Sequence, residues 1–381
     1  MPVYLDNAAS SHPKPESVYL SVTDTLRNIG ANPGRSGHSL AMKASRKIAQ
    51  TRSLLARLFD IEDPNRIVFT TNATEAINLG LKGLLTQEDH VITSSMEHNS
   101  VIRPLRSLET QGIELTVIPC TASGRITIEA MEKAIRRNTR LIILAHASNV
   151  TGGIMPIGEV GVLARKHGIL FMVDAAQTAG LVSISVAKTG IDLLAVPGHK
   201  GLMGPQGTGF LNIGPEISLR PLKEGGTGSQ SELEIQPDFL PDQMESGTLN
   251  TPGLAGLGAG VDFLLHEGLE KIQEKEISLS RMIWNELKKN EKVRLYGPEQ
   301  AEDRTSTISF NITGLNPSAL ASILDTAYHI AVRAGLHCAA LAHRTLKTFP
   351  EGTVRVSPGF FNTEKDIELF LAAIRGISKK I

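Results

Sequence analysis

Short apolar runs alternate with segments of helical spacing from about residue 65 to residue 215, and this alternation constrains the fold more than any other feature. Seven runs rich in branched apolar side chains are predicted strands, at 67–71, 91–94, 114–118, 141–145, 169–173, 193–196 and 209–213. Helices are predicted between them, for example over 74–84 and 156–167. Apolar character without alternation is typical of parallel strands covered on both faces. We therefore expect a doubly wound α/β domain with a mostly parallel seven-stranded sheet between helices.

A change in composition at 221–253 marks the end of this region, because glycines and prolines there interrupt any period. Beyond it we expect a long helical stretch over 254–290, helices over 316–328 and 363–379, and strands over 307–312 and 353–356. This order suits a smaller α+β domain. We expect an N-terminal segment (1–15) near the active site and packed with the small domain, a large domain (16–250) and a small domain (251–381).

Charge and cysteine content exclude several classes of protein. The 39 Lys and Arg residues balance 39 Asp and Glu residues, so neither nucleic acid nor an anionic membrane is an expected partner. No apolar run approaches the roughly 20 residues that span a bilayer, and the N-terminus does not resemble a secretory signal, so we expect a cytoplasmic protein. Cys120 and Cys338 form no CxxC pair, which argues against a disulfide framework and a metal site.

Two polar side chains follow neighbouring predicted strands, where open α/β sheets bind ligands. Asp174 comes directly after the strand at 169–173, and Lys200 comes shortly after the strand at 193–196. Pyridoxal phosphate needs a lysine for its Schiff base and a carboxylate that keeps its pyridine nitrogen protonated. Each residue alone also fits a structural role, as a cap or a solvated lysine. Together they favour a pyridoxal-phosphate site.

A small polar segment leads from the strand at 67–71 into the next helix. Its residues Thr70 to Thr74 are followed at once by helical spacing. The free N–H groups and the dipole at such a helix start favour a phosphate group. Ordinary capping is the alternative. No GxxxxGK[ST] loop occurs in the sequence.

Cys338 is the cysteine that has a candidate chemical role. A free thiol is mostly protonated at neutral pH, and a neighbouring cation would favour the thiolate. His337 and Arg333 are the candidates for that cation. Cys120 ends an apolar run and is interpreted as a core residue.

These motifs together resemble the cysteine desulfurase and selenocysteine lyase group of class V (fold type I) pyridoxal-phosphate enzymes, and the similarity runs nearly end to end. The matching stretches begin at Tyr4, Ser36, Thr74, Glu97, Ser148, Asp174, Gly198, Glu245, Arg333 and Arg355. The resemblance implies the type I transferase fold, a homodimer with shared active sites, and pyridoxal phosphate as the cofactor.

The resemblance also implies roles for individual residues toward the cofactor. Lys200 would form the Schiff base, Asp174 would hold the pyridine nitrogen, and Gln177 would bond the phenolic oxygen. His98 would stack on the ring and relay protons. Thr248 would reach the phosphate in the other subunit. The implied cofactor-binding set is Ala73, Thr74, His98, Asn149, Asp174, Gln177, His199, Lys200 and Thr248.

Substrate residues are implied in the same way. Arg355 and Asn149 would bind the substrate carboxylate region, beside Ala8 and His38. Cys338 would accept the sulfur of L-cysteine as a persulfide, leaving L-alanine, and a sulfur-acceptor protein would follow.

Two departures from the family pattern concern the cofactor and the nucleophile. Pro197 stands where a phosphate-binding hydroxyl is frequent, and Ala339-Ala340 follow Cys338 where a proline is frequent. Three alternatives stay open. One is another class V enzyme, such as an aminotransferase, and one is a selenocysteine lyase or other β-eliminating lyase. The remote one is a non-catalytic sulfur-relay scaffold.

Overall fold

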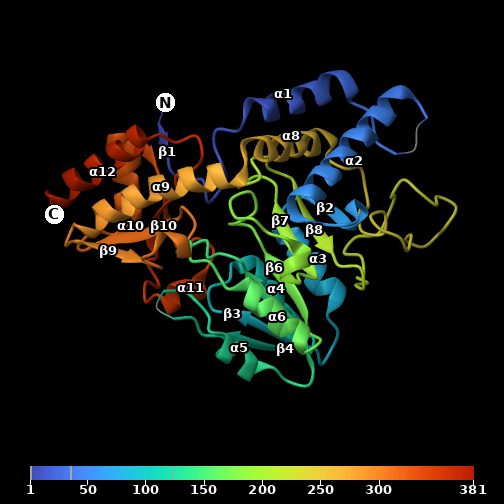
Figure 1. The fold of residues 1–381 in the computed structure, drawn as a ribbon, viewed down its shortest axis with the longest axis horizontal. Helices are drawn as coiled ribbons and strands as arrows, with labels where there is room; N and C mark the ends of the chain where they lie inside the picture. Colours follow the sequence, from blue (N-terminus) through green and yellow to red (C-terminus); the bar gives the residue numbers. More distant parts are fainter. Residues whose placement is uncertain (1, 35–36, 122) are drawn as a thin grey trace.

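The computed structural model describes residues 2–34, 37–121 and 123–381. Within these residues the largest sheet has seven strands in the order β2-β8-β7-β6-β5-β3-β4 (Figure 1). β8 is antiparallel to both of its neighbours, and the remaining neighbouring pairs are parallel. The predicted sheet is therefore confirmed. Its strands are β2 (Ile67–Thr70), β3 (His90–Ser94), β4 (Glu114–Ile118), β5 (Thr139–Ala145), β6 (Leu170–Asp174), β7 (Leu193–Pro197) and β8 (Gly209–Ile213).

The two faces of this sheet enter two separate hydrophobic cores. In β5, Ile142 and Leu144 belong to one core, whereas Leu141 and Ile143 belong to the other. Because both faces are covered, successive side chains of a strand are all apolar. The first core receives α2 (Ser39–Phe59), α5 (Ile128–Ala134), α6 (Ile157–Lys166) and α8 (Thr251–Glu267), and the second receives α3 (Ala73–Leu84) and α4 (Asn99–Glu109).

A second, antiparallel sheet lies in the part of the chain that is expected to form the small domain, and it has a hydrophobic core of its own. In the described chain it has the order β12-β13-β10-β9. Its strands are β9 (Val293–Tyr296), β10 (Ile308–Ile312), β12 (Arg333–Gly335) and β13 (Thr353–Val356). Three helices supply most of the side chains that pack with it, namely α9 (Leu269–Lys288), α10 (Pro317–Tyr328) and α12 (Glu364–Ser378). A short parallel pair of β1 (Val3–Tyr4) with β11 (Ile330–Ala331) brings the N-terminus to this domain.

The helical stretch expected over 254–290 consists of two helices instead of one. Gly268 separates them with a φ of 85°, a value that favours glycine. α8 packs against α2 and α1 (Glu16–Asp24), whereas the buried apolar side chains of α9 from Leu279 onward belong to the small-domain core (Figure 1). The boundary at residues 250 and 251 stays a prediction.

The remaining elements are short. They are α7 (Val186–Thr189), α11 (Ala340–Thr345), a π-helical turn (Thr25–Ile29) and 3-10 turns at Pro64–Arg66 and Ala301–Asp303. None of the helices in the described ranges is long and apolar enough to cross a membrane.

Candidate active site

A cavity of about 220 Å³ lies where the carboxyl ends of the parallel strands meet the small domain. The large domain contributes the starts of α3 and α4 and the segments after β5, β6 and β7. The small domain contributes β12, β13 and the turn before α11. The cavity brings together nearly all of the residues that the sequence singled out: Ala8, Ala73, Thr74, His98, Asn149, Asp174, Gln177, His199, Lys200, Cys338 and Arg355.

Asp174 and Lys200 face this cavity from the ends of β6 and β7. Among the described residues they form no ion pair with each other within 4.0 Å, and Asp174 Oδ1 accepts a hydrogen bond from the Ala176 N–H at 2.9 Å. Burial raises the pKa of Asp174. Burial also lowers the pKa of Lys200 to about 8, against the opposing attraction of Asp174. The two groups are therefore desolvated, and both line the cavity without pairing with each other.

His98 joins a chain of hydrogen bonds between the two helix starts. Its Nδ1 accepts from the Ser100 N–H at 3.0 Å and lies 2.7 Å from Ser100 Oγ, which lies 2.8 Å from Thr74 Oγ1. His98 is thus the N-cap of α4 and also a wall of the cavity. Burial, reinforced by the charge of Lys200, lowers the pKa of His98 to about 4, so its imidazole is neutral at neutral pH.

The start of α3 presents free donors to the same cavity. Asn72 Oδ1 accepts from the Glu75 N–H at 2.9 Å, which leaves the N–H groups of Ala73 and Thr74 for another acceptor. His199 lies nearby, and its buried Nδ1 has no hydrogen-bond partner within the described part of the chain. Pro197 lines the cavity and offers no hydroxyl. These groups fit an anion.

Arg355 is both a structural ion-pair partner and a cavity residue. Its Nη2 lies 2.7 Å from Asp6 Oδ1, its Nη1 donates to the Asn149 carbonyl at 2.9 Å, and its side chain is 2% exposed. Nε is buried without a hydrogen-bond partner in the described ranges. The Asn149 side chain donates to the His337 carbonyl at 2.6 Å, and Gln177 Nε2 donates to the Ala8 carbonyl at 3.2 Å. The bonds to Asp6 and to the Asn149 carbonyl fix the orientation of the Arg355 guanidinium.

Cys338 lies exposed in the short turn between β12 and α11. His337 and Cys338 both have left-handed backbone, with φ of 48° and 58°. The Cys338 carbonyl accepts from the Asn99 N–H at 2.7 Å, which ties the turn to the start of α4. A left-handed conformation at two successive non-glycine residues is held only by such surrounding contacts.

His337 is wrong as the expected cation beside Cys338. Its Nε2 lies 3.0 Å from the Thr353 carbonyl and so carries the proton toward that oxygen. Burial, reinforced by the charge of Arg355, lowers the pKa of His337 to about 2. The ring is neutral, whereas Arg333 lines the cavity as an exposed cation. Cys120 packs against the first core, as expected.

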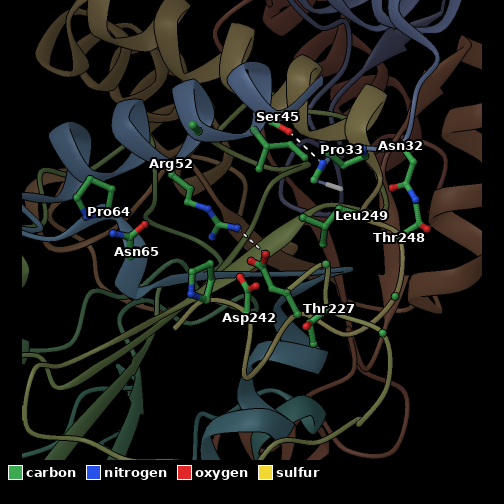
Figure 2. A pocket seen from close by; sticks show the side chains of 18 of the residues that line it. Asn32, Pro33, Ser45, Arg52, Pro64, Asn65, Thr227, Asp242, Thr248 and Leu249 are labelled. Carbon is green, nitrogen blue, oxygen red and sulfur yellow. Dashed lines mark hydrogen bonds and ion pairs between the residues drawn. The ribbon is translucent and has the colours of Figure 1, made fainter. Parts of the chain in front are cut away.

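Thr248 and His38 do not line this cavity. Thr248 lies on the wall of a larger cavity of about 720 Å³, between α2 and the segment that precedes α8 (Figure 2). His38 is the N-cap of α2, where its Nδ1 accepts from the Ala41 N–H. Ser36, in the same motif as His38, is outside the described residues.

Several site residues were missed by sequence reasoning. Ser100 lines the cavity and follows His98 by two positions in a helix start, a signal that could have indicated it. Glu97 is buried beside Asp174, and burial, reinforced by that carboxylate, raises its pKa to about 8. Asp6 and its pairing with Arg355 could not be predicted, because the two residues are far apart in sequence.

Comparison with known proteins agrees with this geometry. The Aminotransferase class-V family model matches residues 3–370. A probable cysteine desulfurase of Methanothermobacter thermautotrophicus is 35% identical, covering 96% of this chain and 92% of that protein. A second, from Pyrococcus abyssi, is 34% identical, covering 100% of this chain and 95% of that protein.

Solved structures give the same result. The apo structure of a cysteine desulfurase from Thermococcus onnurineus NA1 superposes with a TM-score of 0.94 at 32% identity, covering 100% of this chain and 95% of that one. The cysteine desulfurase CsdA from Escherichia coli gives a TM-score of 0.90 at 27% identity, again covering 100% and 95% of the two chains. The resemblance in the sequence and the expected fold type are confirmed. The chain belongs to the class V aminotransferases, a family of pyridoxal-phosphate enzymes, and within it to the cysteine desulfurase-like enzymes.

Proposed function

We propose that this enzyme is a pyridoxal-phosphate-dependent L-cysteine desulfurase, which converts L-cysteine to L-alanine and leaves the sulfur on Cys338 as a persulfide. One observation carries the proposal. Cys338, from the small domain, and Lys200, from the large domain, line the same cavity. A thiol beside the lysine is what sulfur transfer needs and what transamination does not use.

The residues around the cavity fit pyridoxal phosphate. Asp174 and Lys200 are desolvated, form no ion pair with each other and line the same cavity, while the α3 start and the His199 Nδ1, which has no partner in the described residues, suit a phosphate. We assign Gln177 to the phenolic oxygen and neutral His98 to the ring face. Ala73, Thr74 and His199 would hold the phosphate, with Ser100 in place of the hydroxyl that Pro197 lacks. When bound, the cofactor supplies an electron sink for negative charge at the substrate Cα.

We assign the substrate steps to this chain's own groups. Arg355 and Asn149 bind the carboxylate region, next to Ala8. The Lys200 amine, whose lowered pKa favours its neutral form near pH 8, takes the Cα proton. His98, neutral and within the cavity wall, is assigned to proton relay.

Cys338 then acts as the nucleophile, in the same cavity wall as Arg333. Its sulfur attacks the substrate sulfur, so an S–S bond forms while the substrate Cβ–S bond breaks. The electron pair of the broken bond stays with the substrate, whose Cβ takes up a proton and becomes the methyl group of alanine. The transferred sulfur is oxidised to the persulfide level as the carbon is reduced, so no external oxidant is needed.

Further expectations about assembly belong to the same proposal. A homodimer would bring Thr248, and His38 at the start of α2, to the partner's active site, which explains why neither lines the cavity of its own chain. A sulfur-acceptor protein or small thiol would take the persulfide from the exposed Cys338. Location in the cytoplasm stays a prediction from the sequence.

The test is product analysis with L-cysteine and L-selenocysteine on the enzyme reconstituted with pyridoxal phosphate. Cys120→Ala is the matched control for Cys338→Ala, because Cys120 packs against a core away from the cavity lining. We expect alanine from L-cysteine in the wild type and in Cys120→Ala, but not in Cys338→Ala. Equal alanine from all three would refute the role of Cys338. Amino-group transfer to a keto acid would indicate an aminotransferase.

A further inference from the structure

Residues 3–14 cross between the two domains beside the cavity, and we name them the N-terminal strap. In Figure 1 the chain runs from β1, at the small domain, to α1, beside α8 of the large domain. Ala8 and Ala9, near the middle of the strap, line the cavity. The strap is therefore in contact with the small domain, the cavity and the large domain in turn.

The first half of the strap is bonded to the small-domain strands. Val3 and Tyr4 pair with β11, and the Leu5 carbonyl accepts from the Ser357 N–H at 2.8 Å. Asp6 contributes the ion pair to Arg355 at 2.7 Å. One N–H of each terminal guanidinium nitrogen is thus taken, by Asp6 and by the Asn149 carbonyl. The remaining N–H groups are aimed by these two bonds.

The second half of the strap is bonded to the turn that carries Lys200. Ser11 N–H donates to the His199 carbonyl at 3.1 Å, and Ser11 Oγ donates to the Lys200 carbonyl at 2.8 Å. Lys14 Nζ donates to the His199 carbonyl at 2.8 Å and to Ser11 Oγ at 2.7 Å. Three of these hydrogen bonds therefore link two strap residues to two successive backbone carbonyls, one of them that of Lys200 itself, and the fourth joins Lys14 to Ser11.

Lys14 is an unusual residue for a purely structural contact. Its ammonium forms no ion pair with a carboxylate within 4.0 Å in the part of the chain that the structure describes. Burial lowers its pKa to about 8. A partly buried cation without a carboxylate costs free energy, which a neutral residue of similar length would avoid. Its placement on the His199 carbonyl indicates a positioning role.

We propose that the strap positions both sides of the active site at once, with Asp6 orienting Arg355 and with Ser11 and Lys14 fixing the backbone of Lys200. This inference rests on the proposed function, in which Arg355 binds the substrate carboxylate and Lys200 moves the Cα proton. The strap then sets the position of a carboxylate bound to Arg355 relative to the Lys200 amine, because one short segment is hydrogen-bonded to both. Asp6, Ser11 and Lys14 are positioning residues in this scheme.

The test uses Asp6→Asn, Lys14→Met and the double variant, each as the holoenzyme. Lys43→Met is the control, because Lys43 is exposed on α2 and outside the cavity. Losing one charge-assisted hydrogen bond changes a rate or binding constant by about 10-fold or more. We expect Asp6→Asn to raise KM for L-cysteine about 10-fold, and Lys14→Met to lower kcat about 10-fold with little change in KM.

The double variant and a conservative replacement decide whether the strap acts as one unit. When two residues act independently, the fold-changes of the single variants multiply in the double variant to within about 2-fold. We expect kcat/KM of the double variant to fall clearly less than the product of the two single fold-changes. Lys14→Arg keeps a cation and donors, and we expect it to recover most of kcat. The proposal would be overturned if the two single fold-changes multiply in the double variant, or if Lys14→Met has the same kcat as Lys43→Met.

A measurement without substrate separates this inference from the proposed function. The rate at which pyridoxal phosphate leaves the protein, followed by its absorbance, reports how firmly the Lys200 turn is held. We expect Lys14→Met to speed release about 10-fold relative to Lys43→Met, and Lys14→Arg to restore the slow rate. If the wild type makes no alanine from L-cysteine, the proposed function fails while this rate still decides the role of Lys14. Equal release rates in all variants would contradict the strap.

Discussion

The buried ion pair of Arg52 with Glu245 should be essential to the segment that carries Thr248. Arg52 Nη2 lies 2.5 Å from Glu245 Oε2, and the two side chains are 8% and 6% exposed (Figure 2). Glu245 Oε1 accepts from the Phe69 N–H at 2.6 Å, and the guanidinium lies 4.4 Å from the centroid of the Phe69 ring. The pair thereby joins α2, β2 and the segment before α8.

Replacing one partner leaves the other charge buried. Breaking a buried pair in this way costs about 3–5 kcal/mol, whereas replacing both partners by apolar side chains of similar volume is often close to neutral. We expect Arg52→Met to lower the free energy of unfolding by about 4 kcal/mol, because the Glu245 carboxylate then keeps only the Phe69 N–H. The double variant Arg52→Met/Glu245→Met should lose clearly less than the sum of the single losses.

Guanidinium chloride unfolding followed by circular dichroism measures these changes, provided that the slope of the transition is the same in all variants. Arg46→Met is a matched control, because Arg46 is exposed on the same helix and forms no ion pair in the described residues. The reasoning is refuted if Arg52→Met costs less than about 1 kcal/mol. Equally, strict additivity of the two single losses would show that the groups do not interact.

Three further predictions follow from burial and packing. Burial raises the pKa of Glu276 to about 7, so the stability that this side chain contributes is present below pH 4.5 and is lost as the pH rises through 7. The free energy of unfolding of the wild type, measured relative to Glu276→Gln, should therefore fall by roughly 3 kcal/mol over that range. A difference that stays constant with pH would contradict this prediction. Ser100→Ala should weaken pyridoxal-phosphate binding about 10-fold in an absorbance titration, because it removes the hydroxyl that links the two helix starts, and a change below 2-fold would exclude that role. Gly161→Ala should lower the free energy of unfolding by about 1–3 kcal/mol or more, because the added Cβ would lie 1.9 Å from the Thr189 carbonyl oxygen. In the control Gly158→Ala, in the same helix, the added Cβ meets no atom within 4 Å, so this variant should not be destabilised. Equal effects of the two substitutions would disprove the packing argument.

The parts of the fold that the sequence predicted are those with strong local signals. All seven strands of the large sheet were predicted, because burial on both faces makes them continuously apolar. The strands β9 and β12 were not predicted. β9 reads Val-Arg-Leu-Tyr, with only its last residue buried, and β12 reads Arg-Ala-Gly, so neither carries a continuous apolar run. The break at Gly268 was missed because helical spacing continues on both sides of it.

The residues of the candidate site also fall into two groups, those that local sequence signals predicted and those that only the folded structure reveals. Residues at strand ends and helix starts, such as Asp174, Lys200 and Thr74, were found from the sequence because topology brings these positions to one edge of the sheet. Contacts that join distant segments were beyond reach, including Asp6 with Arg355 and Lys14 with the His199 carbonyl. The neutral state of His337 was also beyond reach, since it depends on burial and on Thr353.

The most direct test of the proposed function is a single turnover of the holoenzyme with L-cysteine, quenched by an alkylating reagent and analysed by mass spectrometry of the peptide that contains Cys338. We predict one added sulfur atom on Cys338 in an amount equal to the alanine formed, and none on Cys120. Alanine formed without sulfur on Cys338, or formed as fast by Cys338→Ala, would contradict the account.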